Sequence, residues 1–275
     1  MGISRQARVI AVTSGKGGVG KSVLTANLAW ALVQMGRRVL VLDADLGLAN
    51  LDILLNLEPR ATLHDVLTGS RSLHEVILEG PGGLHILPAG SGLAEYSRLT
   101  SDLRERLPEV LGILVHDYDY LFLDTGAGIS DVVLFTTSLA DEVLVVATPE
   151  PTSFADAYAA IKVMALQQDR SVFSLLMNQV AKERPGKRLA TQLQHVADRF
   201  LREQAGRAIV LAYLGSVPSD PAIERSVCQR RLAMVSAPES AAVRAVHDIA
   251  AHLDAQPRPP SQARPVATST VMTHE

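Results

Sequence analysis

Short apolar runs alternate along the chain with longer segments in which apolar residues recur every three or four positions. The short runs are nearly continuous in Val, Leu, Ile and Phe, whereas a strand with one face in water alternates apolar and polar residues. Continuous runs are typical of strands in a parallel sheet that is covered on both faces. The pattern predicts strands over residues 8–14, 38–44, 84–89, 119–125, 142–148, 171–178 and 208–218.

The intervening segments have helical periodicity. They predict helices over residues 21–35, 63–67, 101–116, 131–139, 153–168, 189–204, 221–232 and 239–253. Parallel neighbouring strands need a crossover connection, which is usually a right-handed helical one. The alternation therefore predicts an α/β fold, a doubly wound and mostly parallel sheet with helices on both faces.

One domain is expected to account for most of the 275 residues. Residues 8–255 carry the alternating pattern, and residues 1–7 precede it as a short extension. From residue 256 the sequence is rich in Pro, Ser and Thr without apolar periodicity, which predicts a disordered tail at 256–275. A tail that binds elsewhere as a peptide is the alternative.

The composition of the chain argues against several classes of protein. The formal net charge of −3 gives no reason to expect a nucleic-acid-binding or strongly membrane-attracted protein. Cys228 is the only cysteine, so one chain cannot supply a Cys-x-x-Cys metal site. No stretch reaches 18 apolar residues, and we expect a cytoplasmic protein.

The first predicted strand runs directly into the glycine-rich segment SGKGGVGKSV. Residues 15–22 match the phosphate-loop pattern G-x-x-x-x-G-K-[ST], in the strand–loop–helix context that the motif requires. Lys21 would neutralise the β- and γ-phosphate oxygens, and Ser22 would offer its hydroxyl to Mg²⁺. A chance match in a structural turn is the alternative. The predicted nucleotide-binding residues of this segment are Gly15, Gly17, Gly18, Val19, Gly20, Lys21, Ser22 and Val23.

Carboxylates lie at the ends of two predicted strands. Asp124 ends DYLFLDT, where a carboxylate can hold a water bound to Mg²⁺. VLDADLGLANLD ends the second predicted strand with Asp43 and Asp45, and strand alternation points both the same way over the carboxyl edge of the sheet. We assign Ser22, Asp43 and Asp124 to magnesium, and Asp45 to orienting the attacking water. A solvated loop acid is the alternative for Asp43 and for Asp45.

Three segments together resemble a known family. KGGVGKS with its additional Lys16, DADLGLANLD and LDTGAGIS resemble the deviant Walker-A ATPases of the MinD/ParA group, which are P-loop NTPases of the SIMIBI type. The phrases DADLGLANLDILL and DTGAGIS resemble most the FlhG/FleN type of flagellar-number regulator within that group. The resemblance extends over roughly residues 8–253.

The resemblance implies an ATPase that binds ATP and Mg²⁺, forms a homodimer with ATP and returns to the monomer through hydrolysis, which we expect to be slow without an activator. Lys16 would reach across the dimer to the phosphates of the partner chain. Lys21, Asp45 and Asp124 complete the catalytic set. The resemblance also places the adenine against Asn178, Pro218, Ser219 and Asp220.

We expect such a switch to act through a protein activator or effector, on the number or placement of flagella or of another polar structure, and to reach a pole or membrane through that partner. The segment 239–253 lacks the basic and bulky apolar faces of a lipid-binding helix, so direct membrane binding is not favoured.

Two alternatives remain. Basic residues surround the apolar stripe Leu189, Leu193, Val196 and Phe200. A ParA-like ATPase that positions or partitions DNA, which it binds as an ATP dimer, is one alternative function, although a solvated helix face explains the same pattern. A nucleotide-binding scaffold without turnover is the other, and the acids at positions 45 and 124 argue against it.

Overall fold

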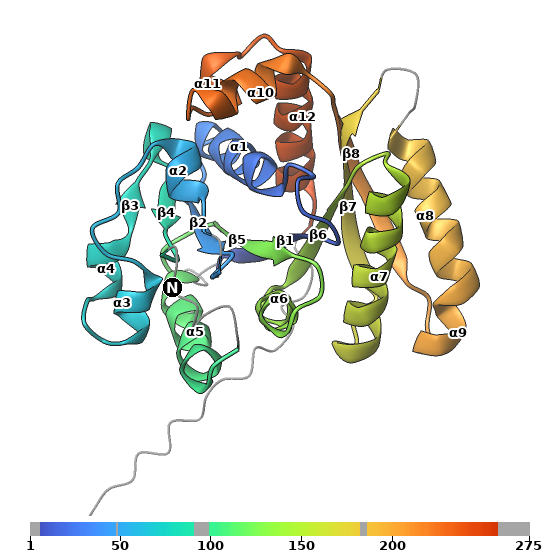
Figure 1. Cartoon of the computed structure of the whole chain (residues 1–275), viewed down its shortest axis with the longest axis horizontal. Helices are drawn as coiled ribbons and strands as arrows, with labels where there is room; N and C mark the ends of the chain where they lie inside the picture. The colour runs from blue at the N-terminus through green and yellow to red at the C-terminus, as the bar shows by residue number, and fades with distance from the viewer. Residues whose placement is uncertain (1–5, 48, 91–98, 182–185, 258–275) are drawn as a thin grey trace, which may run out of the picture.

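The computed structural model describes residues 6–47, 49–90, 99–181 and 186–257 (Figure 1). Within these residues one sheet has the strand order β3-β4-β2-β5-β1-β6-β7-β8, and all neighbours are parallel except β3 and β4. The strands are β1 (Arg8–Ser14), β2 (Val39–Ala44), β3 (Leu78–Glu79), β4 (His85–Leu87), β5 (Tyr120–Ala127), β6 (Glu142–Ala147), β7 (Val172–Val180) and β8 (Val210–Pro218).

Helices cover both faces of this sheet (Figure 1). One face packs against α1 (Lys21–Gln34), α2 (Leu51–Leu55), α11 (Ala233–Ser236) and α12 (Ala241–Ala255), with α10 (Pro221–Cys228) beside them. The other face packs against α3 (Leu63–Leu67), α4 (Leu73–Val76), α5 (Ser101–Leu114), α6 (Asp131–Ser138), α7 (Pro151–Gln167) and α8 (Gly186–Phe200). A 3-10 turn, η1 (Pro81–Gly83), and the short α9 (Arg202–Ala205) complete the described elements.

The strand β1 shows why its sequence is almost entirely apolar. All seven of its residues are buried. Val9 and Ala11 contribute to the core on the α7 side, whereas Ile10 and Val12 contribute to the core on the α1 side. Alternate side chains therefore pack on opposite faces, and the predicted doubly wound α/β sheet is confirmed.

Parallel pairing brings the functional strand ends together at one edge of the sheet. Asp43 at the end of β2 stands opposite Asp124 of β5, and Asp124 stands opposite Val12 of β1. From β1, the chain continues to β2 on one side of the sheet, whereas β6, β7 and β8 follow one another on the other side of β1. The direction of the connections thus reverses at β1, and α/β sheets bind ligands in the crevice at such a point.

Several short elements were not predicted from periodicity. They are α2, α4, α11 and the antiparallel β3, each of five residues or fewer. Such short helices depend on capping and tertiary contacts rather than on their own propensity. Ser72, for example, precedes α4, and its backbone N–H and hydroxyl both donate to Glu75.

The predicted continuous helix over residues 189–204 is wrong, because it is interrupted at Leu201 between α8 and α9. The predicted apolar stripe is also only partly right: Phe200 is 49% exposed, with the guanidinium of Arg199 5.0 Å from the centre of its ring. The buried positions are Ala190, Leu193, Ala197 and Leu201. Packing of Leu201, rather than of Phe200, therefore sets the orientation of this segment.

The expected extension and tail lie mostly outside the described residues. Among the described helices, none has both the length and the apolar character that crossing a bilayer requires.

Candidate functional site

The phosphate loop, residues 15–22, connects β1 to α1. Gly18 and Gly20 have φ angles of 79° and 85°, a left-handed conformation that glycine adopts without steric cost. Gly15 is required for a different reason: a Cβ there would lie 2.1 Å from the carbonyl carbon of Asp156 in α7. The conformation of the loop therefore depends on the left-handed angles of Gly18 and Gly20 and on the close contact of Gly15 with α7.

The N-terminus of α1 closes this loop. Gly20 is the N-cap residue and supplies no side-chain cap, so the first backbone N–H groups of the helix are available to an anion. Lys21 is only 8% exposed, and its Nζ donates to Asp124 Oδ1 at 2.9 Å. Ser22 Oγ lies 3.4 Å from the same nitrogen, and the Thr25 hydroxyl donates to Asp124 Oδ1 at 3.1 Å. The structure therefore brings Lys21, Ser22 and Asp124 into one cluster.

Asp43 lies beside this cluster but is bonded elsewhere. It is 2% exposed and accepts hydrogen bonds from the backbone N–H groups of Asp45, Asn50 and Leu51. Burial, and then the charge of Asp124, raise the pKa of Asp43 to about 7, although the three backbone donors act in the opposite direction. Its carboxylate is thus engaged mainly with the segment that follows β2.

Asp45 is half-buried at the start of that segment. Its Oδ1 lies 3.3 Å from the position that a Cβ on Gly126 would occupy, which places its carboxylate against the segment at the end of β5. Asp45 and Asp124 thus approach the same edge of the sheet from neighbouring strands.

Lys16 is separated from the buried cluster. Its Nζ donates to Glu150 Oε1 at 2.6 Å and to Thr152 Oγ at 2.9 Å, at the beginning of α7. The side chain is 36% exposed, and its hydrogen bond lowers the pKa of Glu150. The two lysines of one loop therefore have different surroundings: Lys21 is paired in the interior and Lys16 on the surface.

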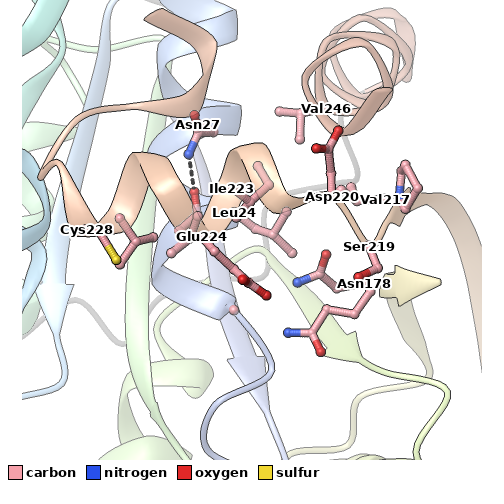
Figure 2. Close-up of a pocket in the computed structure, with 15 residues that line it drawn as sticks. Leu24, Asn27, Asn178, Val217, Ser219, Asp220, Ile223, Glu224, Cys228 and Val246 are labelled. Carbon is pink, nitrogen blue, oxygen red and sulfur yellow. Dashed lines mark hydrogen bonds between the residues drawn. The ribbon is translucent and has the colours of Figure 1, made fainter. Parts of the chain in front are cut away.

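A cavity of about 420 Å³ extends from the loop between α1 and α10 (Figure 2). This volume is typical of small-molecule sites. Asn178 lines it, and its Nδ2 donates to the carbonyl of Val19 at 2.7 Å. Pro218, Ser219 and Asp220 line the same cavity, so the residues predicted to surround a base lie together.

Asp220 also organises the wall of this cavity. It is the N-cap of α10 and accepts from the backbone of Ala222 at 2.9 Å and of Ala242 in α12 at 3.2 Å. Sequence reasoning missed the rest of the lining. The helical pattern directly after Asp220 was the one feature of the sequence that could have indicated that this segment forms a wall of the cavity. The missed lining residues are Leu24, Asn27, Gln179, Val217, Ile223, Glu224, Val227, Cys228 and Val246.

The donor set at the loop fits a magnesium ion. Mg²⁺ prefers oxygen ligands, keeps several waters and needs one or two carboxylates in addition to phosphate oxygens. The Ser22 hydroxyl and the Asp124 carboxylate both lie beside Lys21 Nζ, whereas Asp43 directs its oxygens to backbone donors. In the part of the chain that the structure describes, no group of three or more His, Cys, Asp or Glu residues could hold a metal.

Comparison with known families and proteins agrees with this geometry. Residues 7–177 match the family described as AAA domain, and residues 110–254 match the NUBPL iron-transfer P-loop NTPase family. The chain is 41% identical over 259 residues to the antiactivator FleN of Pseudomonas aeruginosa, covering 94% of this chain and 90% of that protein. It is 35% identical over 245 residues to the flagellum site-determining protein YlxH of Helicobacter pylori, with 88% and 80% covered.

A solved structure supports the same conclusion. The septum site-determining protein MinD of Pyrococcus horikoshii, complexed with Mg-ADP, superposes with a TM-score of 0.75 at 28% identity, over 90% of this chain and 96% of that one. The phosphate loop, the strand order and the extent of these matches together lead to one assignment. The chain belongs to the MinD/ParA family of P-loop ATPases.

Proposed function

We propose that this protein is an ATP-dependent dimerisation switch that hydrolyses ATP to ADP and phosphate. The observation that carries the proposal is the different placement of the two loop lysines. Lys21 is buried beside Ser22 and Asp124, where it can serve a nucleotide in its own chain. Lys16 lies at the surface in an exposed ion pair, where a second chain can approach it.

Each residue has a distinct task in the proposed reaction. The loop N–H groups and Lys21 bind the phosphates, and Ser22 and Asp124 would hold Mg²⁺, which offsets charge on the phosphate oxygens when bound. Asp45 orients the attacking water. Lys16 of the second chain adds positive charge where negative charge develops in the transition state. Hydrolysis thus requires two chains, which links turnover to assembly.

The cavity beside the loop would hold the nucleoside. Asn178, Pro218, Ser219 and Asp220 line it, and Val217 and Val246 give it an apolar surface suited to a base. The Asn178 Nδ2 atom is bonded to the loop, so its carbonyl oxygen is the atom that can accept from the exocyclic amine of adenine.

Substitution of Lys16 tests the dimerisation switch. The parent protein should elute as a monomer with ADP and as a dimer with ATP, and Asp45→Ala should accumulate the ATP dimer because it slows hydrolysis. Lys16→Ala should bind ATP, remain monomeric and lose turnover. Lys162→Ala, a change of the same chemical kind on α7, is the control and should behave as the parent. Unchanged dimerisation and hydrolysis in Lys16→Ala would contradict the proposal.

The relatives suggest a cellular role. FleN is described as an antiactivator and YlxH as flagellum site-determining. We propose that this protein regulates the number or placement of flagella through a protein effector that recognises the ATP dimer and recruits it to the cell pole. Deletion of its gene in the host should change flagellar counts per cell in electron micrographs, and Asp45→Ala should not restore them.

The DNA-binding alternative has weaker support. Arg199, Arg202 and Arg207 line a hollow at the end of α8, but Asp198 and Glu203 line it too. Opposite charges side by side reduce the attraction for a phosphate backbone. Salt-sensitive retention on random duplex DNA that requires ATP would favour the alternative over the protein-effector role.

A further inference from the structure

Asp43 is the buried carboxylate whose contacts the proposed reaction has not used. It ends β2, stands opposite Asp124 and is almost fully buried. Its Oδ1 accepts from the N–H of Asp45 at 3.2 Å, and its Oδ2 accepts from the N–H groups of Asn50 and Leu51 at 3.0 and 3.1 Å. Both oxygens are therefore bonded to backbone donors of the segment that carries Asp45.

Two of these donors belong to the beginning of α2. Asn50 is the N-cap residue of this helix and Leu51 is its first residue, yet the Asn50 side chain makes no capping hydrogen bond. The Asp43 carboxylate accepts these N–H groups from the end of the strand, and its negative charge suits a helix N-terminus. A helix of five residues has little stability of its own, so its position depends on such contacts.

The third donor fixes the other end of the same segment. The N–H of Asp45 donates to Asp43, so Asp45 and Asn50 are both held by one side chain. The Asp45 carboxylate then lies against Gly126 at the end of β5. Water-orienting groups must be placed to within a fraction of an ångström, since a misplacement of about 1 Å can cost about a hundredfold in rate.

We propose that Asp43 is a positioning residue that clamps Asp45, Asn50 and Leu51 through their backbone N–H groups and so places the Asp45 carboxylate for hydrolysis. The inference rests on the proposed ATPase function and departs from the sequence-based assignment of Asp43 to magnesium. The three backbone donors occupy three of the roughly four accepting positions of the carboxylate, and we expect a clamp to keep all three when metal binds.

The substitution Asp43→Asn separates the two roles. Asparagine is close in size, but its NH₂ group would face an N–H donor and lose at least one of the three hydrogen bonds. We expect kcat to fall about tenfold to a hundredfold, while the KM for ATP and the Mg²⁺ concentration for half-maximal activity stay within about twofold of the parent. Ser22→Ala is the matched comparison, because loss of a proposed magnesium ligand should raise the Mg²⁺ midpoint.

Two outcomes of these kinetics would overturn the inference. One is a Mg²⁺ midpoint that rises in Asp43→Asn as it does in Ser22→Ala, with kcat recovered at saturating metal. The other is an unchanged kcat.

Amide hydrogen exchange tests the clamp without relying on turnover or on a variant that folds. In the full-length parent protein, the N–H groups of Asn50 and Leu51 should exchange slowly although they begin a five-residue helix. Addition of Mg²⁺ alone should leave them protected, and acceleration by Mg²⁺ would overturn the clamp. If Asp43→Asn folds, it should lose this protection while α1 keeps its own. Absence of any ATPase activity in the parent would contradict the proposed function, whereas unprotected amides would contradict the clamp.

Discussion

Replacement of Gly15 by alanine tests the close approach between the phosphate loop and α7. The added Cβ would lie 2.1 Å from the carbonyl carbon and oxygen of Asp156 and 2.6 Å from the nitrogen of Ala157. Ordinary contact begins at 3.4 Å, so the two segments must separate by 1.3 Å. All three neighbouring atoms are backbone atoms of a helix, which cannot rotate away as a side chain can.

The expected cost follows from this overlap. Overpacking of a well-packed interior costs about 1–3 kcal/mol, and a clash with backbone belongs at the upper end of that range. Gly17 in the same loop is the matched control, because a Cβ there meets nothing within 4 Å. Gly17→Ala should leave the free energy of unfolding unchanged or raise it by about 0.4–1 kcal/mol, through the unfolded state.

Urea denaturation of the protein without nucleotide measures both variants. Gly15→Ala should lose about 1–3 kcal/mol of unfolding free energy, and its thermal midpoint should fall by about 2–4 °C for each kcal/mol. Its affinity for ATP should fall as well, since the loop must leave α7. If Gly15→Ala and Gly17→Ala unfold at the same urea concentration, the contact with α7 and the reasoning built on it are refuted.

Three further predictions concern other contacts. Glu150→Gln should free Lys16 and lower the protein concentration needed for half-maximal ATP-dependent dimerisation by a few-fold, because exposed ion pairs are weak; sedimentation that shows no change or weaker dimers would contradict this. Asn178→Ala should cost about 1–3 kcal/mol in urea denaturation, because a buried loop carbonyl loses its donor; unchanged stability would show that this bond contributes little. A hydrogen bond from Arg37 is the main cause that lowers the pKa of Asp254, so its contribution to stability is present above the unfolded pKa and is lost as the pH falls through the folded pKa. Asp254→Asn should therefore melt below the parent at pH 7, with a gap that begins to narrow near the unfolded pKa of about 4 and closes as the pH falls through the lower folded pKa; a gap independent of pH would exclude this origin.

The cluster of Lys21, Ser22 and Asp124 could be predicted from the sequence, because the positions of these residues follow from a short motif and from the pairing of parallel strands. Lys21 and Ser22 belong to one short motif between a strand and a helix. Asp124 ends another apolar run, and the carboxyl ends of parallel strands meet at one edge of the sheet. The general rule for parallel sheets, without any specific side-chain contact, was enough to expect these three residues near one another.

Other contacts at the site could not be predicted, because they depend on the course of loop segments, which hydrophobic periodicity does not determine. The ion pair of Lys16 with Glu150 joins residues 134 positions apart, and it requires the beginning of α7 to lie beside the loop. Two of the amide donors to Asp43 come from residues seven and eight positions later, at the beginning of the short helix α2. Asn178 was identified only through the family resemblance, because a single amide at a strand end has many uses.

The difference in burial between Lys16 and Lys21 supports the different tasks proposed for them. The pair between Lys21 and Asp124 is almost fully buried, and removal of one partner from a buried pair leaves a costly isolated charge. If a bound phosphate draws Lys21 away from Asp124, the carboxylate of Asp124 needs another cation beside it. This favours the binding of a nucleotide together with its divalent metal ion. The pair between Lys16 and Glu150 is exposed and cheap to break. In the proposed dimerisation cycle, the contact of Lys16 must form and break in every turn, and an exposed pair of this kind permits that.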